Sequence, residues 1–141
     1  MSTTGQADPI EEEPDLYFAN AHDFVVQYLL PSWRHTTSGV RWCARWWCHA
    51  EAISRLDALW RSFESMRHGD AAGMAVWWRD FADPLMGSLT RENGTFAQCD
   101  AATGEHALNP TWASQEPPPG MFVDEGMIRP RSAAVLAEGD D

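Results

Sequence analysis

The chain has 141 residues, of which 44% are hydrophobic and 22% charged, a balance typical of one globular domain with one core. No apolar run is long enough to span a membrane, and residues 1–14 are acidic and contain proline, so we expect neither a membrane span nor a secretory signal. Three cysteines are too few, and odd in number, for a disulfide scaffold. We therefore expect a soluble protein of a reducing compartment, the cytoplasm.

The formal net charge is −11, from 21 acidic residues and ten basic residues that are all arginine. Residues 1–15 carry five acids and no base, and residues 99–141 carry eight acids and two arginines, whereas residues 16–98 carry eight of each. The acidity therefore belongs to the ends of the chain. It disfavours nonspecific phosphate binding, and it also disfavours a DNA mimic, which needs carboxylates ordered on its folded body.

The composition divides the chain into three parts. Residues 1–15 have no apolar period and contain a run of three glutamates, which predicts a disordered acidic arm. Residues 114–141 contain a proline triplet and an acidic end, which predicts an extended Pro-rich acidic tail. The helical domain is expected between them, over residues 16–113.

Helical periodicity starts near the beginning of this domain. Apolar residues recur at spacings of three and four between Phe18 and Leu29. The pattern predicts a helix over about residues 20–30, with Asn20 as its N-cap and Pro31 as its stop.

The second helix is expected over about residues 49–67, with Gly69 as the stop after it. Its apolar stripe consists of Ala52, Leu56, Leu59, Trp60, Phe63 and Met66. The opposite face is predicted to be solvated and consists of Glu51, Arg55, Asp57, Arg61 and Glu64. Two acid–arginine pairs at spacing four on this face each stabilise the helix by about 0.3 kcal/mol.

A third helical stripe follows, formed by Met74, Trp77, Trp78, Phe81, Leu85 and Leu89. Pro84 lacks a backbone donor and is expected to kink or restart this helix, with Asp83 as the cap of a short continuation. Beyond the turn at Asn93–Gly94 the chain is irregular, with at most a short strand or hairpin near 95–112. The predicted fold is mainly α: a small three-helix domain with a Trp-rich core and an irregular C-terminal zinc-binding loop.

Eight tryptophans are present, and four of them flank Arg34, Arg41 and Arg45: Trp33, Trp42, Trp46 and Trp47. Arginines interleaved with aromatic residues can bind single-stranded nucleic acid, so a nucleic-acid-binding module that uses these arginines and exposed tryptophans is one alternative. Burial of a tryptophan ring of about 200 Å² stabilises a fold by several kcal/mol. Because only three bases are involved, we favour a core role for the tryptophans.

The residues with the most chemical information form two clusters, Cys43, Cys48 and His49, and then Cys99 and His106. Thiolate and imidazole are the donors that tetrahedral zinc prefers, and structural sites draw four ligands from two chain segments. We predict Cys43, His49, Cys99 and His106 as the ligands. Cys48 is a fifth donor, either a small buried residue or an alternative to His49.

Two other interpretations of these clusters stay open. The spacings are wider than a tight C-x-x-C knuckle, so the cysteines could be ordinary core residues and the histidines could cap or pair. A zinc hydrolase needs an open coordination position and a carboxylate base, for which Glu51 or Glu105 is adjacent. No H-E-x-x-H, nucleophile elbow, Walker or dinucleotide motif occurs in the sequence, which disfavours catalysis.

The motif WCARWWCHAEAISRLDALW, with FVVQYLLP before it and MAVWWRDFADPLM and GTFAQC after it, resembles a domain-of-unknown-function family, number 4913, of actinobacteria and actinophages. The resemblance covers about residues 17–106. It implies cysteine and histidine at the four predicted ligand positions and a residue other than cysteine, in most members, at position 48. It also implies an accessory role on a phage or mobile element, but no activity.

These observations favour a noncatalytic, zinc-stabilised helical accessory protein of a phage or mobile element. We expect it to bind a protein partner, since it has a surplus of tryptophan and no catalytic motif. Such a role predicts an exposed apolar surface on the folded body.

Overall fold

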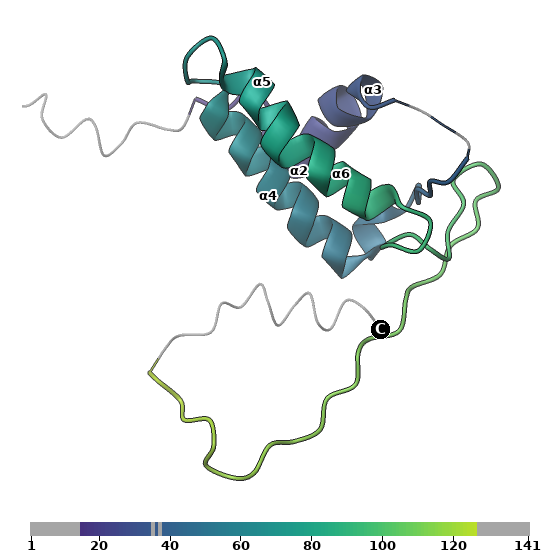
Figure 1. Ribbon diagram of the computed structural model, residues 1–141, viewed down its shortest axis with the longest axis vertical. Helices are drawn as coiled ribbons and strands as arrows, with labels where there is room; N and C mark the ends of the chain where they lie inside the picture. The colour runs from purple at the N-terminus through teal and green to yellow at the C-terminus, as the bar shows by residue number, and fades with distance from the viewer. Residues whose placement is uncertain (1–14, 35, 37, 127–141) are drawn as a thin grey trace, which may run out of the picture.

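The computed structural model describes residues 15–34, 36 and 38–126 of the chain, which form three helical rods followed by irregular segments (Figure 1). Within these residues there is no strand, only isolated bridges between Val40 and Arg91 and between Asp100 and Glu105. None of the described helices is long and apolar enough to cross a membrane. The predicted mainly-α, three-helix class is therefore confirmed, whereas residues 1–14 of the predicted acidic arm lie outside the described part.

The first rod comprises α2 (Ala21–Phe24), a π-helical turn (Val25–Leu29) and α3 (Leu30–Ser32). The Asn20 side chain accepts a hydrogen bond of 2.8 Å from the backbone N–H of Asp23, so the predicted N-cap is confirmed. The rod continues one residue past Pro31 instead of stopping at it. In the preceding π turn the N–H of Leu30 bonds five residues back, to Val25, which accommodates the proline within a continuous helix.

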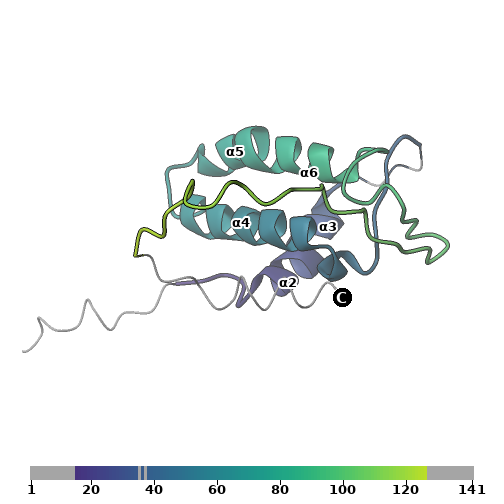
Figure 2. The same cartoon turned by 90° about the horizontal axis from the view of Figure 1, so that it is seen from below.

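The second rod is α4 (Ala50–Met66), close to its predicted bounds, and it packs between the first rod and the third (Figure 2). Both predicted acid–arginine pairs form on its outer face, with oxygen–nitrogen distances of 3.0 Å for Glu51–Arg55 and 2.8 Å for Asp57–Arg61. At its end the N–H of Gly69 bonds to the Met66 carbonyl. A Cβ at Gly73 would lie 2.7 Å from the same carbonyl oxygen, so this close return of the chain requires glycine.

The third rod runs without a break from α5 (Gly73–Trp77) through a π turn (Trp78–Ala82) into α6 (Asp83–Thr90). The predicted kink or restart at Pro84 does not interrupt the rod, and Asp83 lies inside the helix rather than capping it. The N–H of Asp83 bonds to the carbonyl of Trp78, five residues back. As in the first rod, the π turn precedes the proline, and the helix continues through the proline without a break.

The π turn also changes which residues of the third rod face the core. After Trp77 the next buried residue is Ala82, five positions later, followed by Met86 and Leu89. The predicted stripe is wrong at Phe81, whose side chain is 43% exposed. An α-helical period places Phe81 inward, but the extra residue of the π turn shifts the inward face by one position.

Aromatic rings from all three rods meet at the centre of the core. The ring centroids of Phe24 and Phe63 are 5.2 Å apart, those of Phe63 and Trp77 are 5.5 Å apart, and those of Phe24 and Trp77 are 6.1 Å apart. The predicted Trp-rich core is confirmed, because six of the eight tryptophans are buried or partly buried: Trp33, Trp42, Trp46, Trp60, Trp77 and Trp78.

Glu64 corrects the predicted solvated face of α4, because its side chain is only 7% exposed. Its carboxylate accepts backbone N–H bonds of 2.8 Å from Tyr17 and 2.9 Å from Phe18. It also accepts the indole N–H of Trp60 at 3.1 Å and the guanidinium of Arg67 at 3.0 Å. Glu64 therefore fastens the segment before α2 to the end of α4.

The remaining described residues form two further regions. Loops 38–49 and 91–109 lie together at one end of the rods, and we call them the loop end (Figure 1). Residues 110–126 leave this end as an extended segment, the arm, in which every residue is exposed. The predicted tail, 114–141, is thus described as far as residue 126, and its remainder lies outside the described residues.

Candidate metal centre

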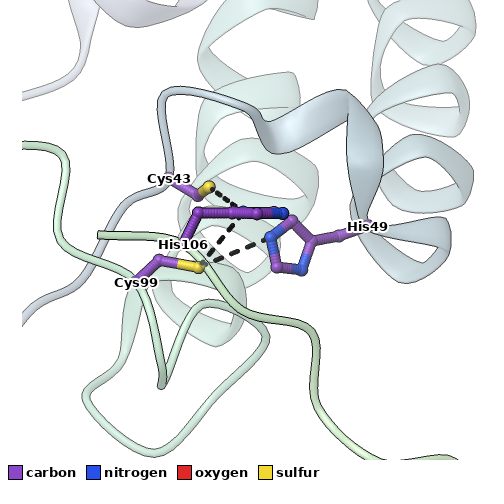
Figure 3. Close-up of side chains that lie close together, drawn as sticks. All are labelled: Cys43, His49, Cys99 and His106. Carbon is purple, nitrogen blue, oxygen red and sulfur yellow. Dashed lines mark hydrogen bonds between the residues drawn. The ribbon is translucent and has the colours of Figure 1, made fainter. Parts of the chain in front are cut away.

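The loop end brings together Cys43, His49, Cys99 and His106, the four residues predicted from the sequence (Figure 3). Cys43 lies before the 3-10 turn Trp46–Cys48, and His49 immediately precedes α4. Cys99 and His106 lie on either side of a short loop. Two chain segments about fifty residues apart thus each contribute one thiol and one imidazole.

Backbone hydrogen bonds fix the first pair. The N–H of Arg41 donates to the Thr90 carbonyl, with a nitrogen–oxygen distance of 2.6 Å, and this holds the segment before Cys43 against the end of α6. The 3-10 turn closes with a bond of 3.1 Å from the His49 N–H to the Trp46 carbonyl. Cys43 and His49 are therefore held at the two ends of one compact bend.

A tight loop fixes the second pair. The N–H of Asp100 donates to the Glu105 carbonyl at 2.9 Å, and the N–H of Gly104 donates back to the Asp100 carbonyl at 2.9 Å. Gly104 has a φ of +81°, a left-handed conformation that favours glycine. The loop returns His106 to the side of Cys99. The short hairpin expected near 95–112 is reduced to this single bridge.

The four donor atoms all lie within 4.8 Å of one another. Cys43 Sγ is 3.1 Å from His106 Nδ1, and Cys99 Sγ is 3.5 Å from His49 Nε2 and 3.9 Å from His106 Nδ1. In a tetrahedral site with ordinary metal–sulfur and metal–nitrogen bonds, neighbouring donor atoms are about 3.4–3.8 Å apart. The donor set therefore fits around one metal ion with small adjustments.

The centre is largely closed to solvent. Cys43 is 1% exposed, Cys99 is 0% and His49 is 4%, while His106 forms the half-buried side. The His49 ring packs edge-on against Phe96, with centroids 5.0 Å apart. Burial and the neighbouring Cys99 together raise the pKa of the Cys43 thiol to about 11, against the opposing effect of a backbone N–H of Arg45. Two thiolates this close are stabilised by a cation between them.

Bonds outside the four donors hold the second segment in place. The guanidinium of Arg41 donates to the Cys99 carbonyl at 3.2 Å. The Asn109 amide donates to the carbonyls of Gly94 at 3.2 Å and Thr95 at 3.0 Å. Sequence reasoning missed Asn109, for which the only signal is the turn-forming dipeptide Asn109–Pro110.

The alternative ligand Cys48 and the two carboxylates considered for a hydrolase lie outside this cluster. Cys48 is a free, partly exposed thiol, and it is not one of the four grouped donors. Glu51 is exposed and its carboxylate pairs with Arg55, and Glu105 is an exposed residue of the tight loop. The cluster therefore contains four nitrogen and sulfur donors and neither of the two candidate carboxylate bases.

The arginines proposed for nucleic-acid binding have separate roles. Arg41 is partly buried and bonded within the loop end. The Arg34 guanidinium lies 4.6 Å above the Trp33 ring, and the Arg45 guanidinium lies 5.8 Å from the centre of the Trp47 ring. Of the three arginines predicted to bind nucleic acid, only Arg34 and Arg45 are thus exposed, and each lies over a tryptophan ring.

The comparisons with known proteins add a family but no activity. No curated protein and no solved structure is similar enough to this chain to be matched. Residues 18–119 match a family described as a domain of unknown function, and this range contains all three helical rods and all four clustered donors. The chain therefore belongs to the family DUF4913.

Proposed function

We propose that the protein is a noncatalytic helical module in which Cys43, His49, Cys99 and His106 bind one structural zinc ion. The closed set of four donors carries this proposal. It joins two distant chain segments that form no strand among the described residues and that meet at the isolated Val40–Arg91 bridge and the bond from Arg41 to the Cys99 carbonyl. Bound there, zinc would act as a crosslink between the segments.

The chemistry of the donors favours zinc over other common cations. Two thiols and two imidazoles in a tetrahedral arrangement are a soft and borderline set, whereas magnesium and calcium require oxygen ligands. The His49 nitrogen that faces the cluster is Nε2, and the His106 nitrogen is Nδ1. Each imidazole thus presents one nitrogen to the same small space.

The same donor set supports a noncatalytic role. Catalytic zinc sites use three protein ligands and keep the fourth position open for water, whereas structural sites are filled by four. The cluster supplies all four donors, and three of them are less than 5% exposed. A zinc ion held there would have no free position from which to activate water.

A role in protein binding is supported by apolar side chains on the surface. Trp47 is 51% exposed, Phe81 is 43%, Trp112 is 95% and Phe122 is 75%. Large aromatic side chains left in water are typical of surfaces that bind another protein. Together with the accessory role on a phage or mobile element that the family resemblance implies, this favours an accessory protein that acts in the cytoplasm through a protein partner.

Metal analysis of the purified protein tests the zinc proposal. We expect one equivalent of zinc per chain, and we expect Cys43→Ser and Cys99→Ser each to reduce the zinc content and the Tm together, because bound metal adds to folding stability. Cys48→Ser is the matched control, since it removes a thiol from the same segment but outside the cluster.

Two results would overturn zinc binding by these four residues, and a third would overturn the crosslink. One is wild-type protein that contains no zinc after expression with zinc present and that does not gain stability when zinc is added. The other is loss of zinc in Cys48→Ser equal to the loss in Cys43→Ser. Retention of zinc in Cys99→Ser would also exclude a crosslink between the two segments.

A further inference from the structure

The arm, residues 110–126, exposes large apolar side chains on both sides of its proline-rich centre. Trp112 is 95% exposed, Met121 63%, Phe122 75% and Val123 75%. The arm leaves the loop end and runs clear of the three rods (Figure 1). Exposed apolar side chains gathered in this way are typical of segments that bind another surface.

The centre of the arm has a defined shape. Pro117, Pro118 and Pro119 form an uninterrupted triplet, which favours the polyproline II conformation and loses little entropy when it binds. Such segments dock on surfaces lined by aromatic rings. Glu116 immediately precedes the triplet, and residues 107–126 contain three acids and no base. The surface that fits the arm is therefore aromatic with a positive charge beside it.

The helical body of this same chain presents a surface of that kind. The rings of Trp33 and Trp78 are stacked, with an interplanar angle of 8° and centroids 6.4 Å apart, and both are partly exposed. The Arg34 guanidinium covers the Trp33 ring at 4.6 Å. Phe81, 43% exposed, follows Trp78 within the π turn. We call Trp33, Arg34, Trp78 and Phe81 the tryptophan face.

We propose that the protein forms a two-fold dimer in which the proline triplet of each copy docks on the tryptophan face of the other. Glu116 of one copy then pairs with Arg34 of its partner. Proline rings pack on the accessible parts of the two partly exposed indoles, and the carboxylate meets the guanidinium that covers the Trp33 ring.

A second copy is an occupant that carries both halves of this contact, the proline triplet and the tryptophan face. Because each chain carries both the arm and the tryptophan face, a two-fold arrangement buries both elements twice with one type of contact. Stable interfaces bury about 800 Å² on each partner, so both reciprocal contacts would have to form together. The proposal rests on the proposed role in protein binding but not on zinc.

A charge exchange between two exposed residues tests this pairing. Sedimentation velocity of the full chain should show a concentration-dependent dimer. Arg34→Glu and Glu116→Arg should each weaken dimerisation about tenfold, because each repels its partner at two symmetric contacts. The double variant should restore the dimer. Arg45→Glu, which alters another exposed arginine next to a tryptophan, is the matched control and should leave the dimer unchanged.

A wild-type protein that stays monomeric up to about 100 μM would overturn the proposal, since a specific interface of this size binds more tightly. It would also be overturned if the double variant stayed as weak as the single variants, or if Arg45→Glu weakened the dimer equally. Zinc content measured on the same samples separates the two proposals. A monomer that contains zinc would overturn the dimer and leave the zinc proposal standing.

Discussion

The helical body and the loop end of this protein are stabilised by different means. In the body, rings such as Phe24, Phe63 and Trp77 pack together from three rods, and backbone hydrogen bonds are satisfied within each rod. The loop end has few regular backbone bonds. It relies on side-chain contacts such as that from Asn109 to the Gly94 carbonyl, and on the four clustered donors.

This difference indicates which region depends on the other. A hydrophobic core of this kind can form from local helices without a metal, because each helix already presents an apolar face. The loop end adds fewer side chains to the core, chiefly Trp46 and Phe96, and its two donor pairs are about fifty residues apart. We therefore expect changes in the core to affect the whole molecule and changes in the loop end to remain local.

The largest effect is expected from Trp77→Ala. Trp77 is 0% exposed, and its removal leaves a cavity between all three rods, which costs about 3–5 kcal/mol. Urea unfolding followed by circular dichroism measures this loss. Trp112→Ala, at a 95% exposed position, is the control and should change the stability of dilute protein by less than about 0.5 kcal/mol. Equal effects of the two substitutions would contradict a core centred on Trp77.

A smaller effect is expected from Glu64→Gln. Burial alone raises the pKa of Glu64, but the N–H groups of Tyr17 and Phe18 and the side chains of Arg67 and Trp60 together hold it below its ordinary value of 4.5. Loss of these charge-assisted bonds should cost about 2 kcal/mol at pH 7.

The same group predicts a pH dependence. A depressed folded pKa stabilises the protein above the unfolded value, near 4.5, and this stabilisation is lost as the pH falls through the folded pKa. Stability measured from pH 7 to pH 3 should fall less steeply in Glu64→Gln than in the wild type. Glu51→Gln, which breaks only an exposed pair, should leave the slope unchanged. Parallel curves for wild type and Glu64→Gln would contradict this role.

The smallest effect is expected from Asn109→Ala, and it tests whether the loop end responds locally. Loss of the two bonds to the Gly94 and Thr95 carbonyls should cost about 1 kcal/mol. Hydrogen exchange should speed up in loop 91–109 and stay unchanged in α4, with zinc content preserved. Faster exchange throughout α4 would show that the two regions are not independent.

Much of the body could be predicted because its helices follow simple periods. The stripe on α4 and the Asn20 cap depend on neighbours three or four residues away, which a sequence displays directly. The π turns could not be predicted in this way, since a bond to the fifth residue back has no residue pattern of its own. The only sequence feature that accompanies each π turn is the proline after it. Because the extra residue of the turn is not visible in the sequence, an α-helical period places Phe81 on the wrong side of the rod.

The donor residues at the loop end could be chosen from chemistry, because few residue types offer sulfur or imidazole. The contacts that support these donors and the body could not be predicted from residue type. Glu64 lies at the edge of an apolar stripe, and only the return of Tyr17 and Phe18 over it reveals that it is buried. Asn109 likewise acquires its role from carbonyls that the fold brings to it.

The two π turns have a consequence for how this chain tolerates changes in length. Each contains one residue more than the same stretch of α-helix needs, so a single deletion within 78–82 could leave an uninterrupted helix. After that deletion Ala82 would follow Trp77 by four residues instead of five, which is the inward-facing spacing of a regular α-helix. Met86 and Leu89 would therefore keep facing the centre, whereas a deletion in the α-helical part of the rod would rotate its two halves by about 100° against each other.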